Sequence, residues 1–185
     1  MADISKSPEG GLPIFSELFS RRQLTEILKW TLYAVLFLFA MLLQTIVLPK
    51  MTIGGIALCV VPTCVVCVAV REGAERAALF TLLASAVYCL SGADCGPIYI
   101  VTLTLTAALA GSVCDHFYTR TFVPALILSL LGLTICEGAA FLFRVYIGSV
   151  AAALWQTVLL PEILFSVLAY PLFYLGAWAV SRIGR

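Results

Sequence analysis

Long apolar segments separated by short polar breaks dominate the chain. Two of these segments, residues 77–90 and 98–114, flank the sequence SGADCGP. An α-helix rises about 1.5 Å per residue and a hydrocarbon core is about 30 Å thick, so each segment, extended by a turn of helix at each end, is long enough to cross a membrane. Ser, Gly, Asp and Pro favour turns over helix interiors. The pattern therefore predicts a transmembrane hairpin.

The same alternation of apolar and polar segments along the whole chain predicts an all-α, polytopic six-helix bundle. Its spans are expected at residues 30–48, 52–70, 75–91, 97–114, 121–143 and 162–181. Prolines interrupt two of them. Pro62 is expected to bend the second span, and Pro171 is expected to kink the last one.

The segments outside the predicted spans are assigned by their polarity. Residues 1–13 predict a mobile polar tail, and 14–29 alternate apolar and charged residues, as in an amphipathic helix lying at the membrane surface. Residues 145–160 are predicted to lie in the outer interface and 182–185 to form a short tail. The charged segment 71–76 is expected to be a solvated loop.

Composition supports a membrane protein. Of the 185 residues, 62% are hydrophobic and only 11% are charged, with a mean hydropathy of +1.08. A soluble domain averages about 25% charged residues, so this chain lacks the polar surface of one.

The positive charges predict the orientation of the bundle. Six spans with a cytoplasmic N-terminus place nine of the eleven Lys and Arg residues on the cytoplasmic side, and only Lys50 and Arg144 outside. Cytoplasmic loops of membrane proteins carry an excess of Lys and Arg. Seven spans, with 145–160 crossing as well, would move Arg182 and Arg185 outside and weaken this asymmetry. We therefore expect both termini to be cytoplasmic.

The fourth predicted span has a polar and small-residue pattern of its own. Thr102, Thr104 and Thr106 alternate with apolar residues, and Gly111 follows among alanines. Small residues let helices approach closely in lipid, so this span is expected inside a bundle or at a docking face for a partner helix.

Glu137 is an acidic residue well inside a predicted span, where an ionisable side chain is costly and should face other helices or water. Arg144 follows on the same helical face. One hypothesis is a solute or proton site, in which Gln44 or Gln156 would complete a polar outer pocket. The other is a hydrogen-bonded Glu that stabilises the bundle or contacts a partner. Pro161, Glu162 and Pro171 in the last span are further candidate contacts.

Motifs of catalysis and of metal or nucleotide binding are missing from the sequence. It contains no phosphate-binding glycine loop, no nucleophile elbow and no paired-histidine metal motif. His116 is the only histidine, and the CxxC at Cys64 and Cys67 lies in an apolar run, where cysteine acts as a small hydrophobe. We therefore expect a protein without enzymatic activity and without a cofactor.

Four stretches of sequence carry a resemblance to a known family. They are LLQTIVLPKMTIGG, VAVREGAERAALFTLLASAVYCLSGADCGPIYIVTLTLTAALAG, FLFRVYIG and LLPEILFSVLAYPLFYLGAWAVSRIGR. In order, spacing and total length, the chain resembles the MreD family of rod shape-determining proteins, in the form found in clostridia-like bacteria. It departs from the family's common Gly-Leu-x-x-Asp pattern before the hairpin turn, where it has Ala84 to Cys89.

The resemblance implies a membrane scaffold in bacterial cell-wall elongation and cell shape. Its expected partners are an MreC-like bitopic protein and, in the same machinery, an MreB-like filament, a SEDS polymerase, a penicillin-binding protein and membrane lipid. The six-helix plan of the family is also similar to the substrate-binding S components of energy-coupling factor transporters. That similarity supplies the alternative hypothesis, a subunit that captures a small solute such as a vitamin.

Overall fold

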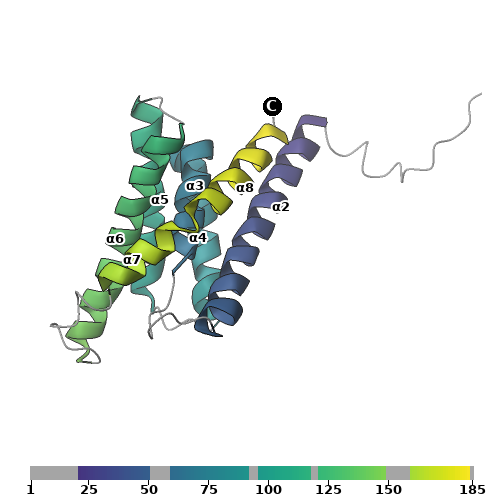
Figure 1. The fold of residues 1–185 in the computed structure, drawn as a ribbon. Coiled ribbons are helices and arrows are strands. Elements are labelled where there is room, and N and C mark those ends of the chain that lie inside the picture. The colour runs from purple at the N-terminus through teal and green to yellow at the C-terminus, as the bar shows by residue number, and fades with distance from the viewer. Residues whose placement is uncertain (1–20, 51–58, 92–95, 118–120, 149–158, 184–185) are drawn as a thin grey trace, which may run out of the picture.

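The computed structural model describes residues 21–50, 59–91, 96–117, 121–148 and 159–183, and all regular structure in these ranges is helical (Figure 1). The long helices run up and down a single bundle. In chain order the elements are α2 (Arg21–Leu42), the π-helical η1 (Leu43–Val47), the 3-10 turn η2 (Leu48–Lys50), α3 (Val61–Glu72), α4 (Ala74–Leu90), α5 (Ile98–Phe117), α6 (Phe122–Tyr146), α7 (Leu159–Val167) and α8 (Tyr170–Ile183).

Helix α2 joins two segments that the sequence pattern had separated. Residues 21–29 were expected in a surface helix that feeds into the first span, and α2 runs unbroken from Arg21 to Leu42. Neither Gly nor Pro occurs between these residues, so nothing in the sequence ends the helix near Lys29. The rest of the predicted surface helix, like the predicted tail 1–13, lies outside the described residues.

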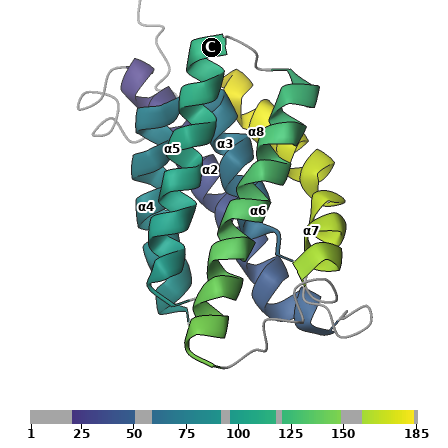
Figure 2. The same cartoon turned by 90° about the vertical axis from the view of Figure 1, so that its left-hand side faces the viewer.

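Helix α3 is short and lies at the centre of the bundle, in contact with α2, α4, α5, α6 and α8 (Figure 2). Every residue from Val61 to Val70 is buried. Its 12 residues span about 18 Å, which is well short of a hydrocarbon core. Pro62 lies in the first turn, where its missing N–H costs nothing, so it does not bend the helix as predicted. Residues 52–58 of the predicted second span lie outside the described residues.

The last two helices form one bent unit. Helix α7 ends at Val167, α8 begins at Tyr170, and the two axes meet at 41°. Pro171 is the second residue of α8 and has no N–H to continue the hydrogen bonding of α7. The kink predicted at Pro171 is therefore present.

Three helical stretches are long and apolar enough to cross a membrane: Gln23–Val47, Ile98–Phe117 and Phe122–Tyr146. The bent pair α7–α8 adds a fourth if it is counted as one span. At 12 and 17 residues, α3 and α4 are below an 18-residue span. The chain is thus an all-helical protein of the membrane class with three or four candidate spans.

The start of α2 and the end of α8 lie at the same end of the bundle, which we call the charged end (Figure 1). The turn between α3 and α4 lies there too. It consists of Gly73 alone, with a φ of 87° that an L side chain rarely adopts. The Ala74 N–H at the start of α4 donates to Asp115 Oδ2 at 3.0 Å, which ties this turn to α5.

Candidate functional site

Polar side chains from six segments meet where α3 begins. Their members, which we call the buried polar cluster, are Gln44, Cys59, Tyr88, Tyr99, Glu137 and Ser166. They come from η1, the residues before α3, α4, α5, α6 and α7, respectively. The cluster exists because α3 starts partway along the bundle and presents its first backbone N–H groups to the helices around it.

Gln44 and Ser166 satisfy these backbone donors. Gln44 Oε1 accepts from the N–H groups of Val60 and Val61 at 3.1 and 3.0 Å, and Ser166 Oγ accepts from the Cys59 N–H at 2.9 Å. The first N–H groups of any helix lack partners within that helix, and leaving them unpaired in an apolar interior is costly. Gln44, the polar residue predicted inside the first span, thus caps α3 from a neighbouring helix.

A chain of hydrogen bonds continues from Gln44 across the bundle. Gln44 Nε2 donates to the Tyr88 hydroxyl at 2.6 Å and to Cys59 Sγ at 3.2 Å. Cys59 Sγ lies 3.1 Å from the Tyr99 hydroxyl, which donates to Glu137 Oε1 at 3.2 Å. Either the Cys59 thiol or the Tyr99 hydroxyl can be the donor of the hydrogen bond between them. The network therefore links η1 to α6 through Cys59, which precedes α3, and through Tyr99 of α5.

Glu137 is the acidic member of the cluster and is only 5% exposed. Burial of a carboxyl group requires hydrogen-bonding or charged neighbours. Tyr99 supplies the hydrogen bond, and both Arg144, on the same helix, and Glu162, in the first turn of α7, lie within electrostatic reach. The buried polar cluster can hold the start of α3 in place. Its carboxyl group, on Glu137, can also bind and release a proton.

The predicted threonine and small-residue stripe of α5 serves packing within the bundle. Thr102, Thr104 and Thr106 each donate to a carbonyl one turn earlier in α5. Thr106 is buried beside Cys136 Sγ, at 3.4 Å, and Gly111 is buried against the backbone of Ala74. Thr106 and Gly111 thus do not form an exposed docking face, and both lie more than a helical turn from Tyr99, the member of the cluster on α5.

The candidate contact residues of the last span lie in two different places. Pro161 and Glu162 lie in the first turn of α7, where Glu162 approaches the buried polar cluster, whereas Pro171 lies at the bend. Gln156, the second glutamine considered for an outer pocket, lies outside the described residues. The structure thus brings Glu137, Gln44, Arg144 and Glu162 into one region and leaves Pro171 apart.

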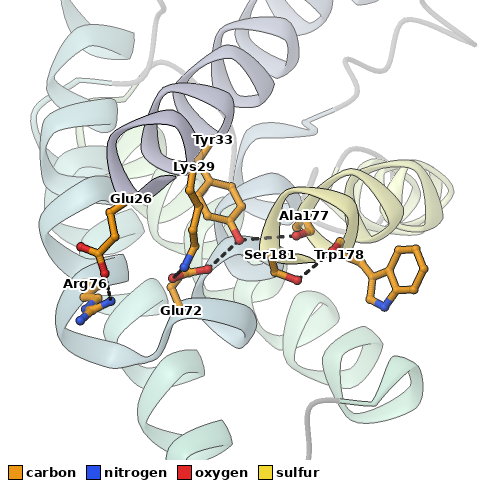
Figure 3. A network of polar contacts seen from close by, with 8 residues as sticks. All are labelled: Glu26, Lys29, Tyr33, Glu72, Arg76, Ala177, Trp178 and Ser181. Atoms are coloured by element: carbon orange, nitrogen blue, oxygen red, sulfur yellow. Dashed lines mark hydrogen bonds and ion pairs between the residues drawn. The ribbon is translucent and has the colours of Figure 1, made fainter. Parts of the chain in front are cut away.

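A second polar group, at the charged end, was not predicted from the sequence. Lys29 Nζ forms an ion pair with Glu72 Oε2, and the Tyr33 hydroxyl donates to Glu72 Oε1 at 2.7 Å (Figure 3). The Glu72 side chain is only 4% exposed, although residues 71–76 were expected to be a solvated loop. This ion pair could have been predicted from the sequence. Lys29 precedes the first predicted span and Glu72 follows the second, so two opposite charges lie at the same level of adjacent antiparallel helices.

Comparison with known proteins gives no relative. No family model matches the chain, and searches of curated proteins and of solved structures return no match either. In the part of the chain that the structure describes, no three His, Cys, Asp or Glu side chains gather as metal ligands.

Proposed function

We propose that the chain is a non-enzymatic membrane scaffold, similar to the MreD family, that packs against the transmembrane helix of an MreC-like partner in the cell-wall elongation machinery. In this proposal the chain crosses the bacterial cell membrane six times, with α7 and α8 counted as one crossing, and both termini are cytoplasmic. The location of α2's start and α8's end at one end of the bundle supports an even number of crossings.

The burial of Glu137 is the observation that carries the scaffold proposal. Its side chain is 5% exposed and hydrogen-bonded to Tyr99, which is 1% exposed, so the acidic group serves the interior of the bundle. Large apolar side chains occupy the exterior instead. On α8 they include Leu172 and Leu175, which are 54% and 60% exposed. Such a helix face can pack against another helix or against lipid.

A solute-capturing transport subunit is the second candidate, and the short α3 favours it. A helix that begins partway across a bundle, facing polar groups from several neighbours, is a common way to build a binding site in membrane transporters. Here the Gln44, Tyr88 and Tyr99 side chains and Glu137 would contact the solute after rearrangement of their present hydrogen bonds.

Co-purification of the tagged full chain from native membranes, after crosslinking and in mild detergent, tests the two candidates. Mass spectrometry that recovers an MreC-like protein with wall-synthesis enzymes supports the scaffold. Recovery of an ATPase pair with a coupling membrane subunit contradicts it and supports transport.

The variant Glu137→Gln further distinguishes the scaffold from the transport subunit. It removes the carboxyl group, but Gln still accepts the hydrogen bond from Tyr99. A scaffold should recover the same partners with this variant as with the unsubstituted protein. A transport subunit should keep its ATPase partners but lose affinity for its solute.

A further inference from the structure

An apolar groove runs between α2 and α4 and opens to the outside of the bundle. We call it the α2–α4 groove; its volume is about 430 Å³, and its lining includes Trp30, Ala34, Phe37, Phe80, Leu83 and Ala84. Helix α2 packs mainly on α3 and α8, and it meets α4 through the Phe80 ring, which contacts the rings of Trp30, Tyr33 and Phe37. Ala34 and Ala84 leave room between the bulkier side chains. The result is a trough along two helices, one of which is a candidate span.

The groove continues into a charged rim. A second hollow shares Trp30, Phe80 and Leu83 with the groove and is closed towards the charged end by Glu26 and Arg76. Arg76 Nη1 lies 3.9 Å from Glu26 Oε1, and the two side chains are 59% and 63% exposed (Figure 3). An exposed ion pair of this length contributes little to stability, so both groups can exchange partners at low cost.

We propose that the α2–α4 groove binds a zwitterionic phospholipid with a primary amine, of the phosphatidylethanolamine class. The groove takes an acyl chain, Arg76 binds the phosphate and Glu26 binds the ammonium group. This inference does not depend on the scaffold proposal.

The charges of the rim favour this headgroup. A guanidinium matches a phosphate with paired N–H donors, and a carboxylate matches an ammonium group. One positive and one negative side chain complement a headgroup that carries one of each. An anionic phospholipid would satisfy Arg76 but would be repelled by Glu26. Trp30, which links the groove to the rim, is a residue type enriched at the level of lipid headgroups.

The size of the groove favours an acyl chain over a helix. A helix about 10 Å wide with a pitch of about 5.4 Å occupies roughly 420 Å³ per turn. The groove could therefore enclose no more than about one turn of a second copy or of a partner helix, whose other turns would rest on its edges. A flexible acyl chain can follow the apolar lining instead, past the exposed Leu83 towards Val87.

Native mass spectrometry of the purified full chain in detergent tests the proposal. Phosphatidylethanolamine, phosphatidylcholine and phosphatidylglycerol with identical acyl chains are each titrated and their adducts counted. We expect phosphatidylethanolamine to bind about tenfold more tightly than phosphatidylglycerol, since the difference is one charge-assisted contact. Equal affinities for all three lipids would overturn the assignment of the headgroup.

Single substitutions test the contributions of the charged rim and of the apolar groove to lipid binding separately. Arg76→Gln should lower the affinity for phosphatidylethanolamine about tenfold, and Glu26→Gln should remove its preference over phosphatidylglycerol. Arg182→Gln is the matched control, because Arg182 is also exposed at the charged end but stacks on Trp178 of α8. An effect of Arg76→Gln no larger than that of Arg182→Gln would contradict the proposal.

Ala34→Leu fills the groove and should weaken all three lipids, whereas Ala108→Leu, at a half-buried site on α5, should not. If Ala34→Leu lowers the melting temperature of the protein, Leu83→Ala replaces it, since Leu83 is 71% exposed and its truncation opens one wall of the groove.

The same mass spectra also reveal dimers of the chain. A dimer that Ala34→Leu abolishes while lipid adducts persist would show that a second copy, not lipid, occupies the groove.

Discussion

Single polar residues in this bundle are stabilised by partners from other helices. The Gln44 side chain makes four such contacts: its oxygen accepts from two backbone N–H groups at the start of α3, and its nitrogen donates to Tyr88 and Cys59. Glu72 pairs with Lys29 and Tyr33 in the same manner at the charged end. Removing one side chain from either group therefore leaves buried donors or acceptors unpaired, which costs more than the net value of the bonds themselves.

Gln44→Met should destabilise the protein by about 1 to 3 kcal/mol, because Met keeps the length of the side chain but leaves the Val60 and Val61 N–H groups without their acceptor. Thermal unfolding in detergent, followed by circular dichroism, measures the change. Thr45→Val is the neighbouring control, since Thr45 is exposed and its hydroxyl only donates to Met41 in its own helix. Equal melting temperatures for the two variants would show that Gln44 does not cap α3.

Lys29→Met should be strongly destabilising, by about 3 to 5 kcal/mol, because it leaves the Glu72 carboxylate buried without its cation. The double variant Lys29→Met with Glu72→Met should recover part of this loss, since no isolated charge then remains. Chemical unfolding of the two single variants and the double variant gives the coupling between the side chains. Strictly additive losses would mean that the ion pair does not form.

At the scale of elements, close contacts between helices in this protein depend on glycine residues, which have no side chain. A Cβ atom built on Gly111 of α5 would lie 2.5 Å from the Ala74 Cα of α4, and one built on Gly132 of α6 would lie 2.8 Å from side-chain atoms of Thr106 and Val66. These glycines let α4, α5 and α6 approach α3 and one another closely, as small residues do in membrane bundles. Gly138, in contrast, has nothing within 4 Å of such a Cβ.

Gly111→Ala should therefore destabilise the bundle by about 1 to 3 kcal/mol, because the start of α4 must move away from α5. Gly138→Ala should be neutral or stabilising by up to about 1 kcal/mol, since alanine is the better helix former and meets open space. The melting temperatures of the two variants give the comparison. Equal shifts in both would indicate that α4 and α5 are not held in this close contact.

The elements of the fold were more predictable than their contacts. The apolar segments expected at 75–91, 97–114 and 121–143 lie within a few residues of α4, α5 and α6, because hydrophobic length alone marks where a helix fits a membrane. The length of α3 was not predictable in this way. An apolar composition around Pro62 suits both a bent long helix and the first turn of a short one, and only the neighbouring caps from Gln44 and Ser166 decide between them.

The same distinction holds for the candidate site. Glu137 was predicted because an ionisable residue in an apolar helix is conspicuous in any sequence. Its partners Tyr99 and Cys59 were not, because tyrosine is common at membrane interfaces and cysteine is common in apolar runs. Which of them faces Glu137 depends on how each helix is rotated about its axis, and this rotation is set by contacts between helices.

The arrangement of the whole molecule leads to a test of its topology. The proposed six crossings put Glu75 and Arg182 on the cytoplasmic side and Tyr146 outside, and all three side chains are exposed. Single cysteines at these positions, treated with a membrane-impermeant maleimide, should react in intact cells only for Tyr146→Cys. Glu75→Cys and Arg182→Cys should react only after the cells are permeabilised.

The background is the protein with Cys89 and Cys95 replaced by serine, because the hairpin turn that contains Cys95 is expected outside; Cys59, Cys64, Cys67, Cys114 and Cys136 are buried. Labelling of Arg182→Cys together with Tyr146→Cys in intact cells would place both positions outside, which requires an even number of crossings between them, and hence that α7 and α8 do not form one bent span. Such a result would weaken the charge asymmetry on which the orientation rests, because Arg182 and Arg185 would then lie outside with Lys50 and Arg144.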